Sequence, residues 1–235
     1  MTKDSKTHAL LKGTNCMSQR TDIIDGSQAF GRNRGLIYTK RCGWIDLGHA
    51  DPEGPRELWT KILHEQTEER TEQGFFRIRY HQEMRTTKFN ITVGAGIRKK
   101  YDIKKNLTPI DAKSVALAIF LDTSHAFESM QTRWPFRLKT DSGYSAEDLV
   151  SNLISFYRTL NPHIDYLKIC QPVSKDIALQ IWDRYGALGT NKNHTHLPFL
   201  YPIPPAQGGP MCGTLPPELN TIIPATPGTL FKEAQ

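Results

Sequence analysis

Residues 108–131 read TPIDAKSVALAIFLDTSHAFESMQ, and this stretch decides the fold class. Thr108 and Pro109 open it in the way that an N-cap and a first helical residue do. The seven residues from Val115 to Leu121 are apolar on every side of a helix, so the stretch predicts a buried helix over 109–131. The same apolar run is far shorter than the ~20 residues that span a bilayer, and we therefore expect no transmembrane segment.

The segments around this helix alternate between helical and extended patterns. Helical spacing of apolar residues predicts further helices over 55–72, 145–161 and 174–186. Alternation in 75–80 places Phe76, Ile78 and Tyr80 on one face, with Arg77 and Arg79 on the other. Residues 88–93 alternate in the same way, which predicts a hairpin. Segments 36–39 and 43–47 are either short strands or an apolar loop. We therefore expect an α+β fold: a mainly helical single domain with one antiparallel β-hairpin.

The two ends of the chain differ from the body in composition. Residues 1–34 are polar without a sustained period, which predicts a flexible N-terminal arm. Residues 35–190 form the expected globular domain. Nine of the fifteen prolines follow His194, and proline at this density favours extended backbone. Because residues 191–235 also carry large apolar side chains, we expect a Pro-rich tail that wraps along the body.

Charge and cysteine content set weaker bounds. The chain holds 30 Lys and Arg against 24 Asp and Glu, and a net charge of +6 is modest for a nucleic-acid-binding protein. Its four cysteines form no CxxC pair, which favours reduced thiols over a zinc centre or a disulfide framework. The first residues lack the apolar region of a signal peptide. We therefore expect a cytoplasmic protein, unless a non-classical secretion route delivers it elsewhere.

The polar end of the long helix supplies the first candidate site. Asp122, His125 and Glu128 follow its apolar half at helical spacing. Carboxylates beside an imidazole at a buried position are costly unless they are paired, ligated or used, which makes these residues candidates for chemistry. The alternative is that the helix emerges into solvent after Leu121 and that all three residues are surface groups.

Two further segments carry the same residue types. Asp46 precedes His49 by three residues between small residues, and an Asp-to-imidazole hydrogen bond can hold a tautomer for acid–base or ligand chemistry. Alternatively, this segment is only a tight turn that caps the next helix. Ser145 and Asp148 form a capping pattern at a helix start, which leaves Glu147 and Asn152 unexplained.

Together these segments resemble an uncharacterised bacterial family of unknown function, whose members include predicted lipoproteins. The resemblance rests on Tyr38 followed by Ile45-Asp46-Leu-Gly-His49, on residues 122–128, and on the Ser-x-Glu-Asp-Leu-x-Ser-Asn start at 145–152. It covers about residues 35–160 and implies that the three polar segments lie together in space. It implies no activity. This chain departs from the family by lacking a signal or lipobox, which puts residence in the cell envelope in doubt.

Other motifs lack the context that they require. Gly94 and Gly96 follow a strand, but Ile97 and basic residues come next in place of a helix start, so we expect no nucleotide cofactor. His194 and His196 are a candidate metal pair, although a solvated loop in the Pro-rich tail is the favoured explanation of them. Cys42 with His49 would be a nucleophile–base pair if they met.

These observations leave two functional hypotheses. The first is a hydrolase with an unknown, cell-envelope-type substrate and a cleft lined by Asp46, His49, Asp122, His125, Glu128 and Glu147. It works by general acid–base catalysis or with a divalent metal, for which His49, His125 and Glu128 are the candidate ligands. The second is a non-catalytic binding module. Its basic hairpin face (Arg77, Arg79, Lys88) and residues 98–105 would engage an anionic partner, a nucleic acid or an acidic protein.

Overall fold

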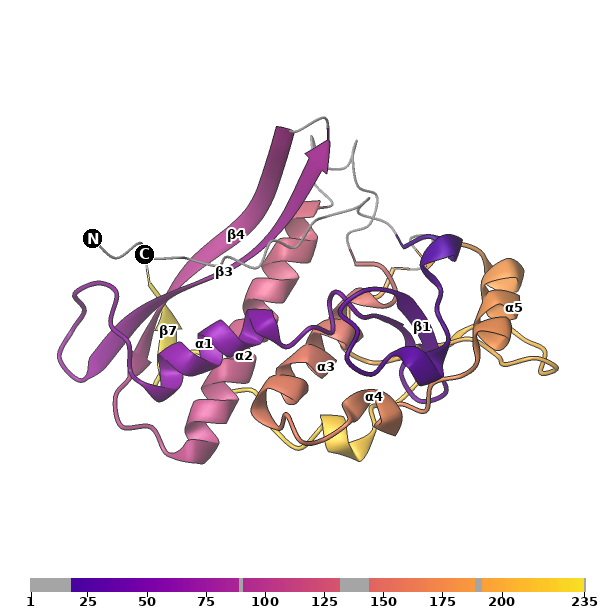
Figure 1. Ribbon diagram of the computed structural model, residues 1–235. Coiled ribbons are helices and arrows are strands. Elements are labelled where there is room, and N and C mark those ends of the chain that lie inside the picture. Colours follow the sequence, from indigo (N-terminus) through magenta and orange to yellow (C-terminus); the bar gives the residue numbers. More distant parts are fainter. Residues whose placement is uncertain (1–17, 89–90, 132–143, 189–191, 235) are drawn as a thin grey trace.

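The computed structural model describes residues 18–88, 91–131, 144–188 and 192–234, with the backbone alone for 84–88 and 91–95. Helices and strands are mixed, so the α+β class is confirmed (Figure 1). The helices are α1 (Glu53–Leu63), α2 (Pro109–Gln131), α3 (Asp148–Leu160), α4 (Tyr166–Ile169) and α5 (Lys175–Tyr185), with short 3-10 turns at Arg20–Asp22, Gly26–Gln28 and Pro217–Leu219. The strands are β1 (Leu36–Thr39), β2 (Gly43–Asp46), β3 (Phe75–Lys88), β4 (Ile91–Lys104), β5 (Phe199–Leu200), β6 (Met211–Cys212) and β7 (Phe231–Glu233).

Helix α2 has the predicted bounds and is the centre of the larger apolar core. Val115, Ala116 and Ile119 are fully buried, as a helix that is apolar all round requires. One side of α2 packs on the β3–β4 hairpin, and its other neighbours are α1 and α3. The helix is buried to its C-terminal end, where even the carboxyl of Glu128 is inaccessible to solvent. The alternative that α2 emerges into solvent after Leu121 is therefore wrong for Glu128, although Asp122 is exposed.

The β3–β4 hairpin is longer than the sequence pattern indicated. Its antiparallel register pairs Phe75 with Lys104, so β4 includes most of the basic segment 98–105. The predicted inner face is confirmed, because Phe76, Ile78 and Tyr80 are buried. Tyr101 and Ile103 continue the alternation on β4 and are buried as well. Strand β7 pairs with the outer edge of β4 and adds a third strand.

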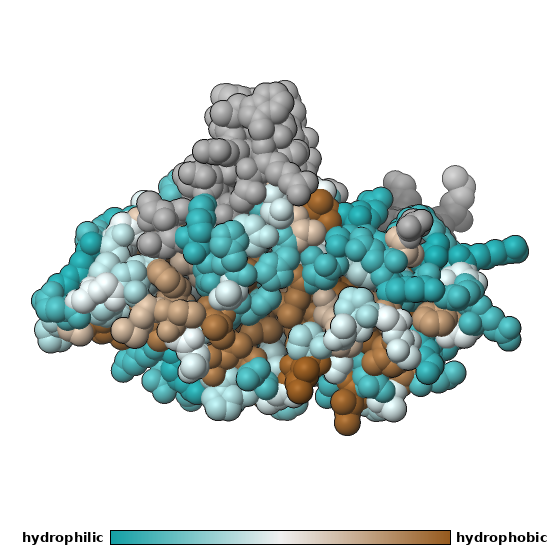
Figure 2. Space-filling view, turned by 180° about the vertical axis from the view of Figure 1, so that it is seen from behind, coloured by the Kyte–Doolittle hydropathy of each residue, from teal (hydrophilic) through white to brown (hydrophobic). Residues whose placement is uncertain are grey.

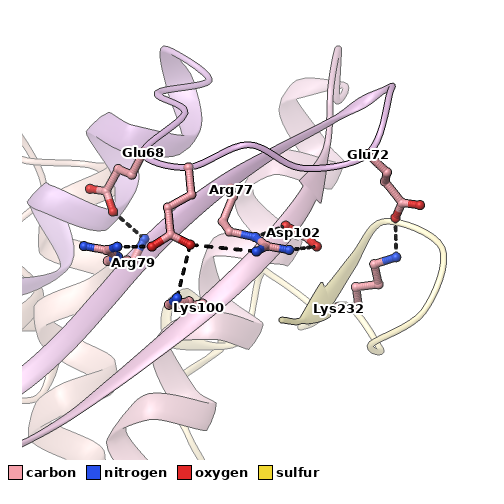
Figure 3. Close-up of polar contacts among 8 residues, drawn as sticks. Glu68, Glu72, Arg77, Arg79, Lys100, Asp102 and Lys232 are labelled. Carbon is pink, nitrogen blue, oxygen red and sulfur yellow. Dashed lines mark hydrogen bonds and ion pairs between the residues drawn. The ribbon is translucent and has the colours of Figure 1, made fainter. Parts of the chain in front are cut away.

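The outer face of this sheet is charged and paired (Figure 3). Arg77 forms two hydrogen bonds with Asp102, of 2.7 and 2.8 Å. Glu69 contacts the side chains of Arg77, Arg79 and Lys100 together. The helix predicted over 55–72 therefore ends early, at Leu63, because the glutamates that follow lie along the sheet and bind its cations.

The expectation of one hairpin is corrected by the structure, in which the described residues form three antiparallel sheets: β1–β2, β3–β4–β7 and β5–β6. The segments left open between strand and loop pair as β1 and β2. Gly43, at the start of β2, has a φ of +68°, and a Cβ there would lie 2.2 Å from the carbonyl oxygen of Phe199. A larger residue would therefore push β5 of the tail away from β2.

Part of the predicted N-terminal arm packs on the body. Ile23 is fully buried and Ala29 nearly so, and the amide of Gly26 donates to the carbonyl of Val173. Residues 20–29 are therefore not a loose arm, since their apolar side chains reach the core. Residues 1–17 lie outside the described ranges.

The Pro-rich tail lies against the body at several places. The Tyr38 hydroxyl donates to the carbonyl of Tyr201 (2.6 Å) and accepts from the Tyr201 amide (2.7 Å). Further along, the Tyr157 hydroxyl accepts from the amides of Thr221 and Ile222. The expected docking of the tail thus uses buried tyrosine hydroxyls as well as apolar contact.

The molecular surface is mixed in polarity. Figure 2 shows apolar residues gathered in the middle of the face seen from behind, between hydrophilic margins. Ile110 and Leu63 are among the large apolar side chains that remain exposed. Within the described ranges, no helix combines the length and the apolarity of a membrane span.

Candidate functional site

The structure gathers four of the predicted site residues, namely one histidine and three acidic residues near it. Asp46 and His49 come from the end of β2 and the turn after it, Glu128 from the end of α2, and Glu147 from the start of α3. A residue not predicted as part of the site, Asp148, completes the cluster. We call these five residues the acidic cluster.

The turn after β2 presents His49 at the edge of the cluster. The Asp46 carbonyl accepts from the Ala50 amide, and the Asp46 Oδ1 accepts from the Gly48 amide at 2.8 Å. Leu47 and Ala50 are fully buried and anchor the turn to the core. His49 is left at the rim, where its side chain keeps 36% of its surface exposed.

His49 faces two carboxylates. Its Nδ1 lies 3.2 Å from Asp46 Oδ2 and 3.5 Å from Asp148 Oδ1. Burial alone would lower the pKa of His49, but the Asp46 contact and the charges of Asp46, Asp148 and Glu128 raise it well above its usual range. Burial likewise opposes ionisation of Asp46, yet His49 and the Gly48 amide lower the pKa of that carboxyl. At neutral pH the pair is therefore an imidazolium beside a carboxylate.

The remaining carboxyls are held inside the protein. Glu128 Oε2 accepts from the Tyr144 amide at 3.1 Å, and Glu147 Oε1 accepts from the Ser18 hydroxyl at 3.0 Å. Asp148 Oδ2 accepts from the Ser145 amide at 2.8 Å. Glu128, Glu147 and Asp148 are at most 5% exposed, so they form the interior of a site whose open edge is His49 and Asp46.

Burial sets the protonation of these three carboxyls. It raises the pKa of Glu147 to about 7 and also raises that of Glu128. Burial and the charges of Glu128 and Glu147 together raise the pKa of Asp148 well above its usual range. Asp148 and Glu128 each affect the pKa of the other, so the two carboxyls release their protons as a pair. The cluster thus holds protons at neutral pH, and Glu147 can take up or release one there.

Asp122 is not part of this cluster. Its carboxylate accepts from the Tyr101 hydroxyl at 2.5 Å and pairs with Lys99 at 2.8 Å. These contacts join α2 to β4, and the Asp122 side chain remains 47% exposed. Asp122 therefore has a structural role in this arrangement.

His125 belongs to a second group of aromatic and imidazole rings. Its ring centroid lies 4.9 Å from that of His196 and 6.1 Å from that of Tyr144, which in turn lies 4.2 Å from His194. Burial lowers the pKa of His125, and burial with the nearby His125 lowers that of His196 to about 4. These rings hold the first part of the tail against the segment that carries Glu147.

Three residues of the site are not identified by the sequence pattern. Capping accounts for Asp148, which does accept from Ser145, but its other oxygen faces His49. The available signal is two consecutive acids where a cap needs one. Ser18 and Tyr144 carry no comparable signal, because each contributes a hydrogen bond that depends on long-range packing.

The ligand sets predicted for a metal or a thiol nucleophile are not assembled. In the part of the chain that the structure describes, no group of three or more His, Cys, Asp or Glu residues is arranged to hold a metal ion. Cys42 is fully buried, and so is Cys170, whose thiol pKa is raised by the neighbouring Cys42 and by burial. Cys42 is therefore not a partner for the half-exposed His49.

A surface pocket of about 180 Å³ lies elsewhere, between α1, the start of β3 and the start of α2. Trp59, Ile62, Phe76 and Leu107 contribute to its mainly apolar lining. None of its lining residues belongs to the acidic cluster, so its volume says nothing about the chemistry of that site.

Comparison of the chain with protein-family models, with curated proteins and with solved structures found no match. The resemblance to the uncharacterised bacterial family therefore stays a prediction.

Proposed function

We propose that the protein is a hydrolase whose active site is the acidic cluster. The observation that carries this proposal is that an imidazolium lies beside carboxyls whose pKa values are shifted in opposite directions. The pKa of Asp46 is lowered, whereas those of Glu147 and Asp148 are raised. Titratable groups whose surroundings push their pKa values apart are typical of acid–base catalysts. The resemblance of the sequence suggests a cell-envelope component, such as an ester or a polymer, as the substrate.

Each residue has a distinct part in this proposal. Because His49 directs Nδ1 at Asp46 and Asp148, the proposal assigns the N–H of its Nε2 to an oxygen on which negative charge develops. Glu147, with a pKa of about 7, takes a proton from the attacking water and returns it to the leaving group. Asp46 holds the imidazolium in place, and burial together with the charge of Asp46 keeps the pKa of Glu147 high.

The alternative role as a binding module gains no support from the hairpin. Among the cations that it would offer to an anionic partner, Arg77, Arg79 and Lys100 are paired with Asp102 and Glu69 (Figure 3). Lys99 is paired with Asp122 and Glu233, whereas Arg98, Lys104 and Lys105 are exposed. The side chain of Lys88 lies outside the described residues. A phosphate ligand would have to displace these intramolecular partners before it could bind.

The test is a panel of chromogenic esters, phosphates and glycosides, with the purified full chain. We expect hydrolysis of at least one class, reduced roughly 10²-fold or more by Glu147→Gln and by His49→Ala, because loss of a general base or of an oxyanion donor has effects of this size. His163→Ala is the matched control, because His163 is exposed and outside the cluster. Activity that all three variants retain would refute the proposal. Activity lost with a chelator and restored by a divalent ion would indicate the metal-assisted form.

A further inference from the structure

The buried part of the acidic cluster contains carboxyl oxygens that have no hydrogen-bond donor in the described part of the chain. Glu147 is 3% exposed, and its Oε2 has no hydrogen-bond partner among the described residues. Glu128 is fully buried, and its Oε1 meets no donor there apart from the proton that it can share with Asp148. Buried carboxyl oxygens are normally paired, so an unpaired one inside a candidate active site indicates where a ligand donates.

The charge of the cluster indicates that the ligand carries a positive charge. Four carboxyl groups surround one imidazolium, and His49 is the only described basic side chain that forms an ion pair with them. Lys192 acts on Glu128 through its charge, but its side chain is exposed and has contacts of its own. The site therefore holds an excess of acid that a cation would balance.

We infer that the acidic cluster binds a primary ammonium group, which donates to Glu147 Oε2 and to the carboxyl of Glu128. The inference rests on the proposed function and extends it: Glu147 returns its proton to the leaving group, so the bound ammonium is the released product and the substrate of the hydrolase is an amide of a primary amine. An ammonium group carries three donors and one positive charge, which suits a small set of acceptors that already surround an imidazolium. A divalent ion would require at least four to six ligands around one point, and the described residues do not provide that arrangement. The ligand enters past His49 and Asp46, which are 36% and 31% exposed.

The experiment compares n-butylammonium with n-butanol as probes of equal length, by calorimetric titration of the full chain at pH 8. We expect saturable binding of the amine and none of the alcohol. Glu147→Gln should weaken binding of the amine at least tenfold, and Glu53→Gln, an exposed surface change, should leave it unaltered. His49→Ala should bind the amine as well as or better than the unaltered chain, because it removes the competing positive charge. At pH 5 the amine should bind more weakly, because Glu147 is then protonated.

Several results would overturn the inference. The inference is wrong if the protein does not bind the amine, or if it binds the alcohol equally well. It is also wrong if the Glu147→Gln variant, with a native circular dichroism spectrum, binds the amine as tightly as the unaltered chain, or if the protein binds Ca²⁺ or Zn²⁺ but not the amine. Failure of the proposed function is distinguishable: the amine would still bind as described, but His49→Ala would hydrolyse the chromogenic substrate normally. Conversely, hydrolysis that depends on Glu147 without amine binding would refute only the inference.

Discussion

Replacing Glu147 by glutamine should stabilise the protein, and the gain should depend on pH. Glutamine has the shape of glutamate, and its amide oxygen can accept from the Ser18 hydroxyl as Glu147 Oε1 does. The change removes only the ability to ionise. A buried carboxyl with a raised pKa opposes folding wherever the unfolded chain has already released its proton.

The magnitude follows from the raised pKa. The unfolded chain releases the proton near pH 4.5, and the folded protein releases it only at about 7. Between these values the folded state binds more protons, so the free energy of unfolding falls as the pH rises. Since one pKa unit corresponds to ~1.4 kcal/mol, the full loss is about 3 kcal/mol at pH 8. Glu147→Gln should therefore be about 3 kcal/mol more stable than the unaltered chain at pH 8 and nearly equal to it at pH 4.5.

The assay is urea denaturation at half-unit steps between pH 4.5 and 8.5, followed by tryptophan fluorescence and circular dichroism. Glu53→Gln, at the exposed start of α1, is the control for removal of one surface carboxylate. In thermal unfolding the gain at pH 8 should appear as a rise of roughly 6–12 °C for a chain of this size. A stability difference that is the same at both ends of the pH range, or a loss of more than ~1 kcal/mol at pH 8, would contradict the buried, raised-pKa carboxyl.

Three further predictions test other parts of the structure. His49→Ala should destabilise the protein by about 1 kcal/mol below pH 6.5, a value discounted for the partial exposure of the ring. The loss should vanish at high pH, because the raised pKa of His49 contributes stability that disappears as the imidazolium deprotonates. An equal loss in urea denaturation at pH 6 and pH 10 would speak against the ion contacts. Arg77→Ala should lower the melting temperature at pH 7 but hardly at pH 2. The reason is that Arg77 lowers the pKa of Asp102, and the stabilisation from this pair is lost as Asp102 protonates. A melting temperature unchanged at pH 7 would show that the pair contributes nothing. Tyr38→Phe should cost about 2 kcal/mol, because it removes the hydroxyl that hydrogen-bonds both the amide and the carbonyl of the buried Tyr201. Limited proteolysis should then cut the tail faster, and unchanged cleavage would mean that this contact does not hold the tail.

The parts of the fold that the sequence predicts well are those governed by local pattern. The apolar stretch of α2 has its expected bounds because Thr108 and Pro109 start the helix and every face is buried in tertiary contact. The alternation in β3 identifies its inner face for the same reason, since period two is a property of the strand itself.

Long-range pairing decides the parts that local pattern does not predict. Residues 64–72 are rich in glutamate and compatible with a helix, yet Glu68 and Glu69 bind cations, among them residues of the hairpin. Nothing within that segment reveals which arginines and lysines will lie opposite it. The pattern therefore places the end of α1 too late in the chain.

The candidate site shows the same division. Helical spacing directs attention to the end of α2, but Asp122 and Glu128 are six residues apart, which turns them about 120° from one another around the axis. They therefore cannot face the same pocket, and only Glu128 reaches the cluster. The sequence pattern does not identify Asp148 as a site residue, because its role in capping α3 already explains an acid there, while its other oxygen faces His49.

The pairing of β7 with β4 has a consequence for synthesis of the chain. Strand β4 is made early, but the strand that covers its outer edge, Phe231–Glu233, leaves the ribosome only after nearly all the other elements. Throughout that interval the edge offers unpaired amides and carbonyls to any other extended chain. Until Phe231–Glu233 has been made, the nascent protein is therefore exposed to intermolecular strand pairing at this edge of β4, and a chain truncated before Phe231 would remain in that state.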